Sequence, residues 1–407
     1  DFAGAKLYKP SHLRVLLLDI LNSRSGIEDS YTCCHEAIGW LFNAQDAYDT
    51  GGISAGYSFN LGWLPPYPET SGYIIPTLLK CARYLDTPIK DECRERALKI
   101  ANWLVEIQLE SGAYEGGPVA GKKKTLAHRL ISINRKPMVF DTGQVIRGLL
   151  AAYEETGEQR YLETSMAGAD WMAGCQNNDG SWTDFTYNDI GGVYHTYVDW
   201  PLIRLSQIYG ERRFEETARR NLNWALSRQT TKGWFKNNAF FTDKPPLSHT
   251  IGYATDGLLE CGILIGNNDY VQAATRAAEA LRGTHWIEQG NGLFPGTLNE
   301  DWESKAHYSC LTGNAQISII FLKLYEITRD RRYLSASGKI NNTLKAIQNI
   351  AFSNPGTRGG IKGSLPVYGD YMAFTYPCWA TKYYIDALLL EEVITYESVC
   401  AEPPVSA

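Results

Sequence analysis

The chain has 407 residues, of which 44% are hydrophobic, and a formal net charge of −6. This charge provides no basic surface for nucleic acid or for an anionic membrane, so we expect neither as a partner. No apolar run approaches the roughly 18 residues that a membrane-spanning helix needs. The sequence says nothing about the oligomeric state.

The nine cysteines are scattered, odd in number and without a CxxC pair. Such usage predicts free thiols in a reducing compartment, and hence a cytoplasmic protein. Because the chain begins with Asp1 rather than methionine, a removed signal peptide, with a periplasmic or secreted location, stays open.

Two kinds of helix alternate along the chain after a first helix at about 10–22. Charge-rich segments predict helices with one face in water, and segments of small and apolar residues predict buried helices. The charge-rich helices are expected at 30–44, 91–108, 159–175, 212–228, 268–287 and 331–348. The buried helices are expected at 72–85, 143–156, 198–209, 251–265, 312–327 and 377–392.

A short motif recurs near the end of the charge-rich helices, about every sixty residues. Its clearest copies are Trp103–Gln108–Gly112–Tyr114, Trp171–Gln176–Gly180–Trp182 and Trp224–Gln229–Gly233–Phe235, with Gln45, Glu288 and Gln348 at the matching places of weaker copies. The same spacing occurs in triterpene cyclases, where the glutamine caps a helix end. We interpret it here as a structural turn, since the DxDD cluster that a cyclase needs is missing from the sequence.

Six such helix pairs predict an all-α fold, an (α/α)6 barrel of six helical hairpins with the buried helices inside. We expect one domain over residues 1–407, with the extra helix at about 10–22 covering one end and a short C-terminal tail at about 394–407. Short turns lie at one end of such a barrel and long loops at the other. The long loops therefore converge on one mouth, and loops of this length are usually functional.

Two carboxylates occupy equivalent places just before consecutive inner helices. Glu69 and Asp141 should therefore be neighbours in space. A pair of carboxylates is the usual equipment for glycoside hydrolysis, one protonating the leaving oxygen and one activating water. An acidic residue at a helix start is equally expected as a cap or first-turn charge, so both interpretations stay open.

His249 and Tyr253 are four residues apart and share a helix face. Such a pair can remove the proton next to the carboxylate of a uronic acid, as lyases and C5-epimerases do, although it is more often a satisfied polar contact. Further substrate-binding candidates lie in or beside the mouth loops. They are Tyr73, Gln144, Trp182, Tyr194, His195, Asn314, Gln316, Lys362, Tyr376 and Trp379. No His/Cys set has ligand spacing, so we expect no metal and no cofactor.

The segments PETSGYIIPTLL, FDTGQVIRGLL, HTIGYATDGLLE, CLTGNAQ and YPCWATKYYIDALL together resemble bacterial (α/α)6-toroid proteins often encoded among surface-polysaccharide genes. The resemblance runs from about residue 37 to 392 and implies this fold and a glycan context. More distantly, the layout is similar to six-hairpin glycosidases and to α/α-barrel polysaccharide lyases. In unsaturated glucuronyl hydrolases, acids at the mouth of neighbouring hairpins carry the chemistry, which matches the positions of Glu69 and Asp141.

Three functions follow from these residues. The first is a hydrolase that cleaves an acidic or surface polysaccharide or oligosaccharide through Glu69 and Asp141. The second is a lyase or epimerase that acts on uronic acids through His249 with Tyr253 or Tyr376. The third is a glycan-binding or assembly protein without catalytic activity. The depth of the loop-lined mouth favours an enzyme, and we rank the hydrolase first.

Overall fold

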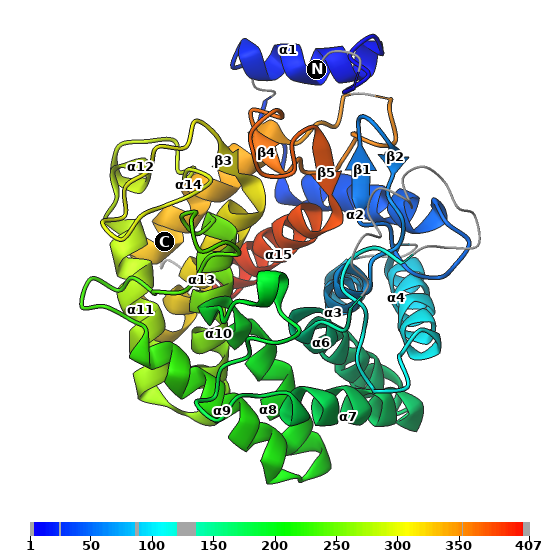
Figure 1. The fold of residues 1–407 in the computed structure, drawn as a ribbon. Coiled ribbons are helices and arrows are strands. Elements are labelled where there is room, and N and C mark those ends of the chain that lie inside the picture. The colour runs from blue at the N-terminus through cyan, green and yellow to red at the C-terminus, as the bar shows by residue number, and fades with distance from the viewer. Residues whose placement is uncertain (1–3, 24–25, 86–88, 120–135, 352, 402–407) are drawn as a thin grey trace.

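The computed structural model describes residues 4–23, 26–85, 89–119, 136–351 and 353–401, the last five by their backbone alone. Six inner helices surround the barrel axis and six outer helices enclose them (Figure 1). The inner helices are α3 (Pro68–Tyr84), α6 (Val139–Thr156), α8 (Thr196–Tyr209), α10 (Ser248–Ile265), α13 (Leu311–Thr328) and α15 (Cys378–Ala401). The outer helices are α2 (Ser30–Asp46), α4 (Ile89–Glu106), α7 (Gln159–Gly174), α9 (Arg212–Ser227), α11 (Asn268–Arg282) and α14 (Arg331–Ile347). The predicted (α/α)6 barrel is confirmed.

The two ends of the chain form the sixth hairpin together. Inner helices α3, α6, α8, α10 and α13 each pack against the outer helix that follows them, whereas α15 packs against α2. Helix α15 also packs against α3 and thereby closes the inner ring. Left-handed glycines end two of these inner helices, with φ of 72° at Gly157 and 85° at Gly210.

Several helix bounds differ from the sequence predictions. Several inner helices begin earlier than expected, so Glu69, Asp141 and His249 lie in first turns and not in loops. Pro68 at the first position of α3 favours this early start, because its fixed φ suits a helix. Outer helix α11 ends at Arg282, before Gly283. At the C-terminus, α15 continues to Ala401, beyond the helix end predicted at 392.

Short strands and helices decorate the mouth. One antiparallel sheet joins β1 (Gly56–Ser58) to β2 (Gly62–Trp63) and to β5 (Thr375–Pro377), and so ties the first mouth loop to the last. A second sheet pairs β3 (Ser309–Cys310) with β4 (Ser364–Leu365). The loops also contain η1 (Tyr187–Asp189), η2 (Val193–His195) and α12 (His285–Glu288). The predicted extra helix is present as α1 (Pro10–Ile20), but it lies at the edge of the molecule beyond β4 and β5 and not across the barrel end (Figure 1).

The recurring glutamine links consecutive outer helices. The Gln108 amide donates to Gly112 O in its own turn and to Thr164 O of α7, both at 2.8 Å. Gln45, Gln176 and Gln229 each donate in the same way to their own glycine turn and to the next outer helix. The motif is therefore structural, as predicted, but it joins two helices and does not merely cap one.

The glycine of each motif copy is required by the same contact. Gly112 has a φ of 89°, and a Cβ built on it would lie 2.3 Å from Ala167 O of α7. Gly180, with a φ of 90°, would meet Arg220 O of α9 at 2.4 Å. A side chain at either position would separate the turn from the neighbouring helix.

Gln348 closes the ring of outer helices. Its amide donates to Gly359 O at 2.8 Å and to Cys33 O of α2 at 2.9 Å, while Tyr384 donates to its carbonyl at 3.0 Å. The Glu288 copy has lost the amide, and side chains of α14 replace it. Lys339 donates to Ile287 O at 2.8 Å, and Thr343 donates to Asn291 O at 2.6 Å.

We expect Gln348→Ala to lower the free energy of unfolding by about 1–3 kcal/mol, because it leaves buried carbonyls without donors. Denaturant unfolding monitored by circular dichroism measures this change. Gln289→Ala, at an exposed position of the mouth, is the matched control, and about 0.5 kcal/mol or less is expected there. Equal stability losses in the two variants would contradict a closing role for Gln348.

Candidate functional site

Glu69 and Asp141 face each other through a tyrosine hydroxyl. The hydroxyl oxygen of Tyr187 lies 3.0 Å from Glu69 Oε2 and 3.0 Å from Asp141 Oδ2. The hydroxyl of Tyr67 lies 2.9 Å from that of Tyr187. Neither acid is the N-cap of its helix, since Tyr67 and Met138 occupy those positions. The predicted proximity of the two acids is confirmed, and their catalytic role stays a prediction.

Glycines let the two inner helices that carry these acids approach closely. A Cβ built on Gly72 of α3 would lie 2.5 Å from Gln144 O of α6. A Cβ on Gly148 of α6 would lie 2.2 Å from Gly72 O. Backbone contact at both positions brings the first turns of α3 and α6 together, and with them the two carboxylates.

Burial raises the pKa of both carboxyls. For Glu69 the first cause is desolvation, and the neighbouring charge of Asp141 raises the pKa further. Desolvation is also the first cause for Asp141, but hydrogen bonds from Tyr67, Tyr187 and Gly117 N act against it. The Gly117 N–H lies 3.4 Å from Asp141 Oδ1. Tyr67 and Tyr187 lower the pKa of Glu69 as well, so the backbone donor of Gly117 is what makes Asp141 release its proton more readily than Glu69.

His249 and Tyr253 form a second polar group near the mouth. Their ring centroids are 4.3 Å apart, and His249 Nδ1 lies 2.9 Å from Gln316 Oε1. Desolvation lowers the pKa of His249 to about 4, so the imidazole is neutral near pH 7. Since Gln316 Oε1 can only accept, Nδ1 carries the proton and Nε2 is the basic nitrogen.

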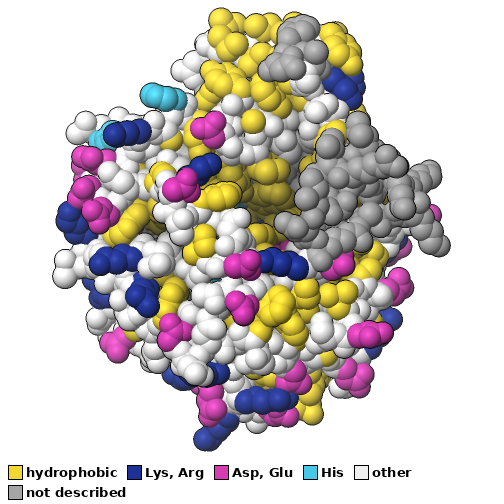
Figure 2. Space-filling model, in the orientation of Figure 1, with side chains coloured by type: hydrophobic (Ala, Val, Ile, Leu, Met, Phe, Trp, Pro, Cys, Tyr) yellow, Lys and Arg dark blue, Asp and Glu magenta, His cyan; other side chains and the backbone are white. Residues whose placement is uncertain are grey.

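A large cavity adjoins these residues. It has a volume of about 1520 Å³ and is rich in aromatic side chains, among them Phe240, Trp302 and Tyr371. Neither carboxylate lines it, but Phe240 lies 5.2 Å from the Tyr187 ring and Tyr371 lies 5.6 Å from the His249 ring. Figure 2 shows hydrophobic side chains in the hollow of this face, bordered by charged ones.

Trp379 and Gln316, which were both predicted to bind substrate, contact other residues of the site. Trp379 is half-buried, donates to the Tyr371 hydroxyl at 2.7 Å and meets the Tyr67 ring at 6.3 Å. Gln316 orients His249. Tyr73, Tyr194 and Gln144 are buried at the inner end of the site. The Gln144 amide has no hydrogen-bond partner among the described residues.

Five further residues that were predicted to bind substrate are buried and make contacts within the protein, and their binding role stays a prediction. Trp182 is fully buried and donates to Met172 O at 2.9 Å, while His195 packs beside it and contacts Gly192 O at 2.8 Å. Asn314 donates to Cys310 O at 2.8 Å and holds both backbone polar groups of Phe294. Lys362 pairs with Asp19 of α1. Tyr376 is buried in β5 and stacks on Phe59.

Three tyrosines of the site were not predicted from the sequence: Tyr67, Tyr187 and Tyr371. Tyr67 directly precedes Pro68 and Glu69. Because proline favours the first position of a helix, the sequence could have predicted Tyr67 as the N-cap residue. Tyr187 and Tyr371 come from long loops, where residue spacing specifies no position.

Among the described residues, no group of three His, Cys, Asp or Glu is arranged to hold a metal ion. No described helix is long and apolar enough to cross a membrane.

The chain matches a known protein family. A family model described as Beta-L-arabinofuranosidase, GH127 catalytic domain, matches residues 70–346. None of the curated proteins searched matches the chain.

Solved structures share the fold. An unsaturated glucuronyl hydrolase specific for heparin has a TM-score of 0.67 at 14% identity, covering 90% of this chain and 98% of its own. The glycosaminoglycan-degrading unsaturated glucuronyl hydrolase from Bacillus sp. GL1 has a TM-score of 0.66 at 14% identity, with coverage of 88% and 96%. Cellobiose 2-epimerase from Bacillus thermoamylovorans B4167 has a TM-score of 0.67 at 13% identity, with coverage of 89% and 96%. The predicted likeness to six-hairpin glycosidases is confirmed.

We expect Asp141→Asn to raise the melting temperature, and more at pH 8 than at pH 5. Because the folded protein holds the Asp141 proton more tightly than the unfolded chain does, wild-type stability falls as pH rises from the unfolded pKa to the raised folded one. Each pH unit in that window costs up to about 1.4 kcal/mol. Calorimetry at several pH values measures the difference, with Asp49→Asn at an exposed position as control. A pH-independent difference would contradict the raised pKa.

Proposed function

Since the chain belongs to the Beta-L-arabinofuranosidase GH127 catalytic domain family, we propose that Glu69 and Asp141 perform the hydrolysis that membership implies. The chain is a carbohydrate-active enzyme, a glycoside hydrolase with a carbohydrate substrate. This identity excludes the third alternative, a glycan-binding protein without activity. The observation that carries the proposal is the pair of buried carboxylates joined by one hydroxyl.

The two acids have different environments and hence different roles. Glu69 is buried without a backbone donor in the described structure, so it is the general acid that protonates the leaving oxygen. Asp141 accepts from Gly117 N and is the ionised partner. Two carboxyls whose environments separate their proton affinities are the usual arrangement in glycosidases.

The spacing of the acids favours retention of anomeric configuration. Because Oε2 of Glu69 and Oδ2 of Asp141 each lie 3.0 Å from one hydroxyl oxygen, they are no more than twice that distance apart. Inverting enzymes separate their carboxyl groups by roughly 6.5–9.5 Å to admit a water, and retaining enzymes by roughly 5–5.5 Å. In the retaining reaction Asp141 attacks the anomeric carbon as Glu69 protonates the departing oxygen. Water then releases the sugar while Glu69 takes the proton of that water.

Tyr187 occupies the position of the reacting atoms. Its hydroxyl bridges the same two oxygens that the anomeric carbon and leaving oxygen must contact, so a substrate displaces it. The loop has the backbone for such a shift, because Phe185, Asn188 and Asp189 all have φ between 52° and 59° and Gly191 and Gly192 follow. Left-handed conformations at residues other than glycine cost energy that a rearrangement can release.

The adjoining cavity suits an oligosaccharide. Its volume of about 1520 Å³ exceeds the roughly 300–1000 Å³ of a typical small-molecule site. Its aromatic side chains offer faces for the C–H groups of sugar rings. We propose a β-L-arabinofuranosyl unit at the carboxylates, following the family description, with the remaining sugars in the cavity. An acidic oligosaccharide of the kind that unsaturated glucuronyl hydrolases cleave is the substrate to compare.

We expect Glu69→Gln and Asp141→Asn each to reduce kcat by about 10²–10⁴-fold, because each removes a proton donor or a nucleophile. Release of sugar from p-nitrophenyl β-L-arabinofuranoside and from an unsaturated uronyl disaccharide measures the loss, and proton NMR follows the anomer formed first. Glu300→Gln, an exposed acid outside this pair, is the control. Full activity in either variant, or an inverted product, would contradict the assignment.

A second candidate function rests on His249. Its neutral imidazole, fixed by Gln316 beside Tyr253, is suited to remove a proton next to a carbonyl or carboxylate, as an epimerase or lyase requires. This group is distinct from the carboxylate pair, so the two functions separate by mutation.

We expect His249→Ala to keep hydrolytic activity within about threefold, because histidine is absent from the two-carboxylate chemistry. Incorporation of deuterium from solvent into the substrate, and formation of an unsaturated product absorbing in the ultraviolet, measure the alternative. If either signal occurs in the wild type and vanishes in His249→Ala, the epimerase or lyase is the function. Glu69→Gln would then retain that signal.

A further inference from the structure

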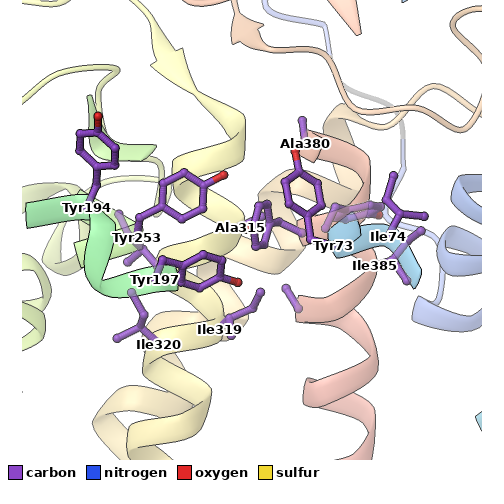
Figure 3. Close-up of a cluster of buried hydrophobic side chains, with 14 of the residues drawn as sticks. Tyr73, Ile74, Tyr194, Tyr197, Tyr253, Ala315, Ile319, Ile320, Ala380 and Ile385 are labelled. Carbon is purple, nitrogen blue, oxygen red and sulfur yellow. The ribbon is translucent and has the colours of Figure 1, made fainter. Parts of the chain in front are cut away.

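Helix α1 turns its polar side to the protein and its apolar side to solvent. Its buried side chains are His12, Val15 and Asp19, of which only the valine is apolar. The inner helices of the barrel do the reverse, and Figure 3 shows Ile319 and Ile385 among the apolar side chains packed in the core. A helix on a protein surface normally buries its apolar stripe. The inverted orientation of α1 therefore leaves an apolar face available to a partner outside the chain.

The outward side of α1 is made of large apolar side chains. Leu17 is 44% exposed, Ile20 58% and Leu21, directly after the helix, 72%. Leu13 lies one turn before Leu17 on the same side and is half-buried. We call these four residues the α1 patch. Figure 2 shows hydrophobic side chains along the top of the molecule, where Figure 1 places α1. Such an exposed group is typical of a surface that contacts another molecule.

The polar side of α1 fixes the orientation of the helix. Asp19 pairs with Lys362 through one carboxylate oxygen, and its other oxygen accepts from Val367 N at 2.7 Å. The His12 ring stacks on Phe59, with the ring centroids 4.0 Å apart. Phe59 belongs to the first mouth loop, and Lys362 and Val367 belong to the last. These contacts hold α1 on the mouth loops, so the α1 patch is kept facing outward.

Every exposed charge in residues 4–23 is positive. Lys9 and Arg14 are exposed and Lys6 is half-buried. The one acid of this segment, Asp19, is buried in its pair with Lys362. The net charge of −6 over the whole chain predicted no attraction to an anionic membrane, but α1 is a local exception to that charge.

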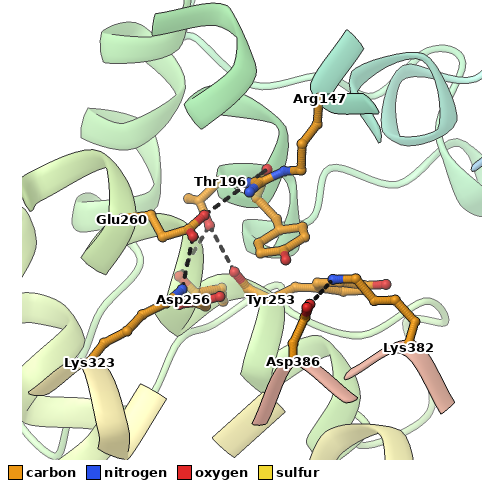
Figure 4. Close-up of polar contacts among 10 residues, drawn as sticks. Arg147, Thr196, Tyr253, Asp256, Glu260, Lys323, Lys382 and Asp386 are labelled. Atoms are coloured by element: carbon orange, nitrogen blue, oxygen red, sulfur yellow. Dashed lines mark hydrogen bonds and ion pairs between the residues drawn. The ribbon is translucent and has the colours of Figure 1, made fainter. Parts of the chain in front are cut away.

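A second group of exposed apolar side chains lies at the closed end of the barrel, where the short turns join inner to outer helices. It includes Ile263 and Ile327, which are 46% and 45% exposed. The charges at this end compensate each other, since Arg147 and Lys323 both pair with Glu260, at 3.0 Å and 2.9 Å (Figure 4). The cavity there is lined by as many acidic as basic side chains. The closed end therefore lacks the excess of positive charge that accompanies the α1 patch.

The charges beside the α1 patch favour a lipid surface over a second copy of the chain. In a two-fold contact the patch would meet itself, so Arg14, midway along the helix, would lie close to its own counterpart. Like charges placed together in this way oppose association. An anionic bilayer instead offers hydrocarbon to the leucines and negative headgroups to the cations. Because α1 lies at the edge of the molecule, its whole length can rest on a flat surface (Figure 1).

We propose that α1 docks the protein on the surface of an anionic phospholipid bilayer. Leu17, Ile20 and Leu21 enter the boundary between headgroups and acyl chains, while Lys9 and Arg14 contact the headgroup phosphates. Helices of this kind lie in the plane of the interface with their apolar face about 5–10 Å deep. The carboxylate pair takes no part in this docking, so hydrolysis of a soluble substrate does not depend on it.

Co-sedimentation of the full chain with lipid vesicles tests the docking. We expect binding to vesicles of phosphatidylcholine mixed with phosphatidylglycerol, and binding about tenfold weaker to phosphatidylcholine alone. Leu17→Ser with Leu21→Ser should weaken binding to the mixed vesicles about tenfold or more, because it removes apolar area from the interface. Lys9→Ala should weaken that binding about fivefold. Ile263→Ser with Ile327→Ser, a similarly exposed pair at the closed end, is the matched control and should bind as the wild type does.

The docking is overturned if the wild type binds neither kind of vesicle, or if the control pair loses as much binding as the leucine pair. Equal binding to the two kinds of vesicle would overturn the role of Lys9 and Arg14. Sedimentation equilibrium without lipid gives a further check. A dimer that Leu17→Ser with Leu21→Ser converts to a monomer would assign the α1 patch to a second copy and overturn the lipid surface. Vesicle binding is measured without substrate, so its failure is distinct from a failure of hydrolysis.

Discussion

The fold depends on one repeated contact, in which a glutamine amide on one outer helix donates to a carbonyl of the next. An amide can serve two carbonyls at once, so each glutamine fixes both its own glycine turn and its neighbour. The contact repeats around the barrel until Gln348 reaches Cys33 of α2. The outer ring is thus closed by side chains, while the inner ring closes by packing of α15 on α3. A barrel closed in both layers fixes the helix ends between which the mouth loops run.

The positions of the two carboxyl groups in the candidate site depend on the packing of the inner helices. Glycines at the contact of α3 and α6 allow the helices to touch through their backbones, so the first turns carry Glu69 and Asp141 to opposite sides of one hydroxyl. Burial at the same place makes both acids hold protons more tightly than in water. Only Asp141 of the two accepts a backbone hydrogen bond in the described structure, which is the basis of the roles proposed for them. The glycines that allow α3 and α6 to pack closely therefore also bring the two carboxyl groups together.

The two ends of the barrel have different physical characters. The mouth is built from long loops, aromatic rings and two carboxyl groups that share one tyrosine hydroxyl. The closed end is built from rigid helix ends and opposite charges that compensate each other. The buried rings of Tyr73, Tyr197, Tyr253 and Tyr383 pack together between the two ends.

The sequence alone determined the repeat, the helix pairs and the nearness of Glu69 to Asp141. The spacing of apolar residues along the chain indicates the helices, and residues at equivalent positions of consecutive repeats lie in neighbouring hairpins. It did not show that Trp182 and Asn314 donate to backbone carbonyls within the protein, because the same side chain can bond either to a sugar or to a nearby helix. It also missed Tyr187 and the pairing of α15 with α2. Those depend on where a long loop folds back and on where the chain ends meet. Only the tertiary structure decided them, because contacts between residues far apart in the chain leave no spacing to read.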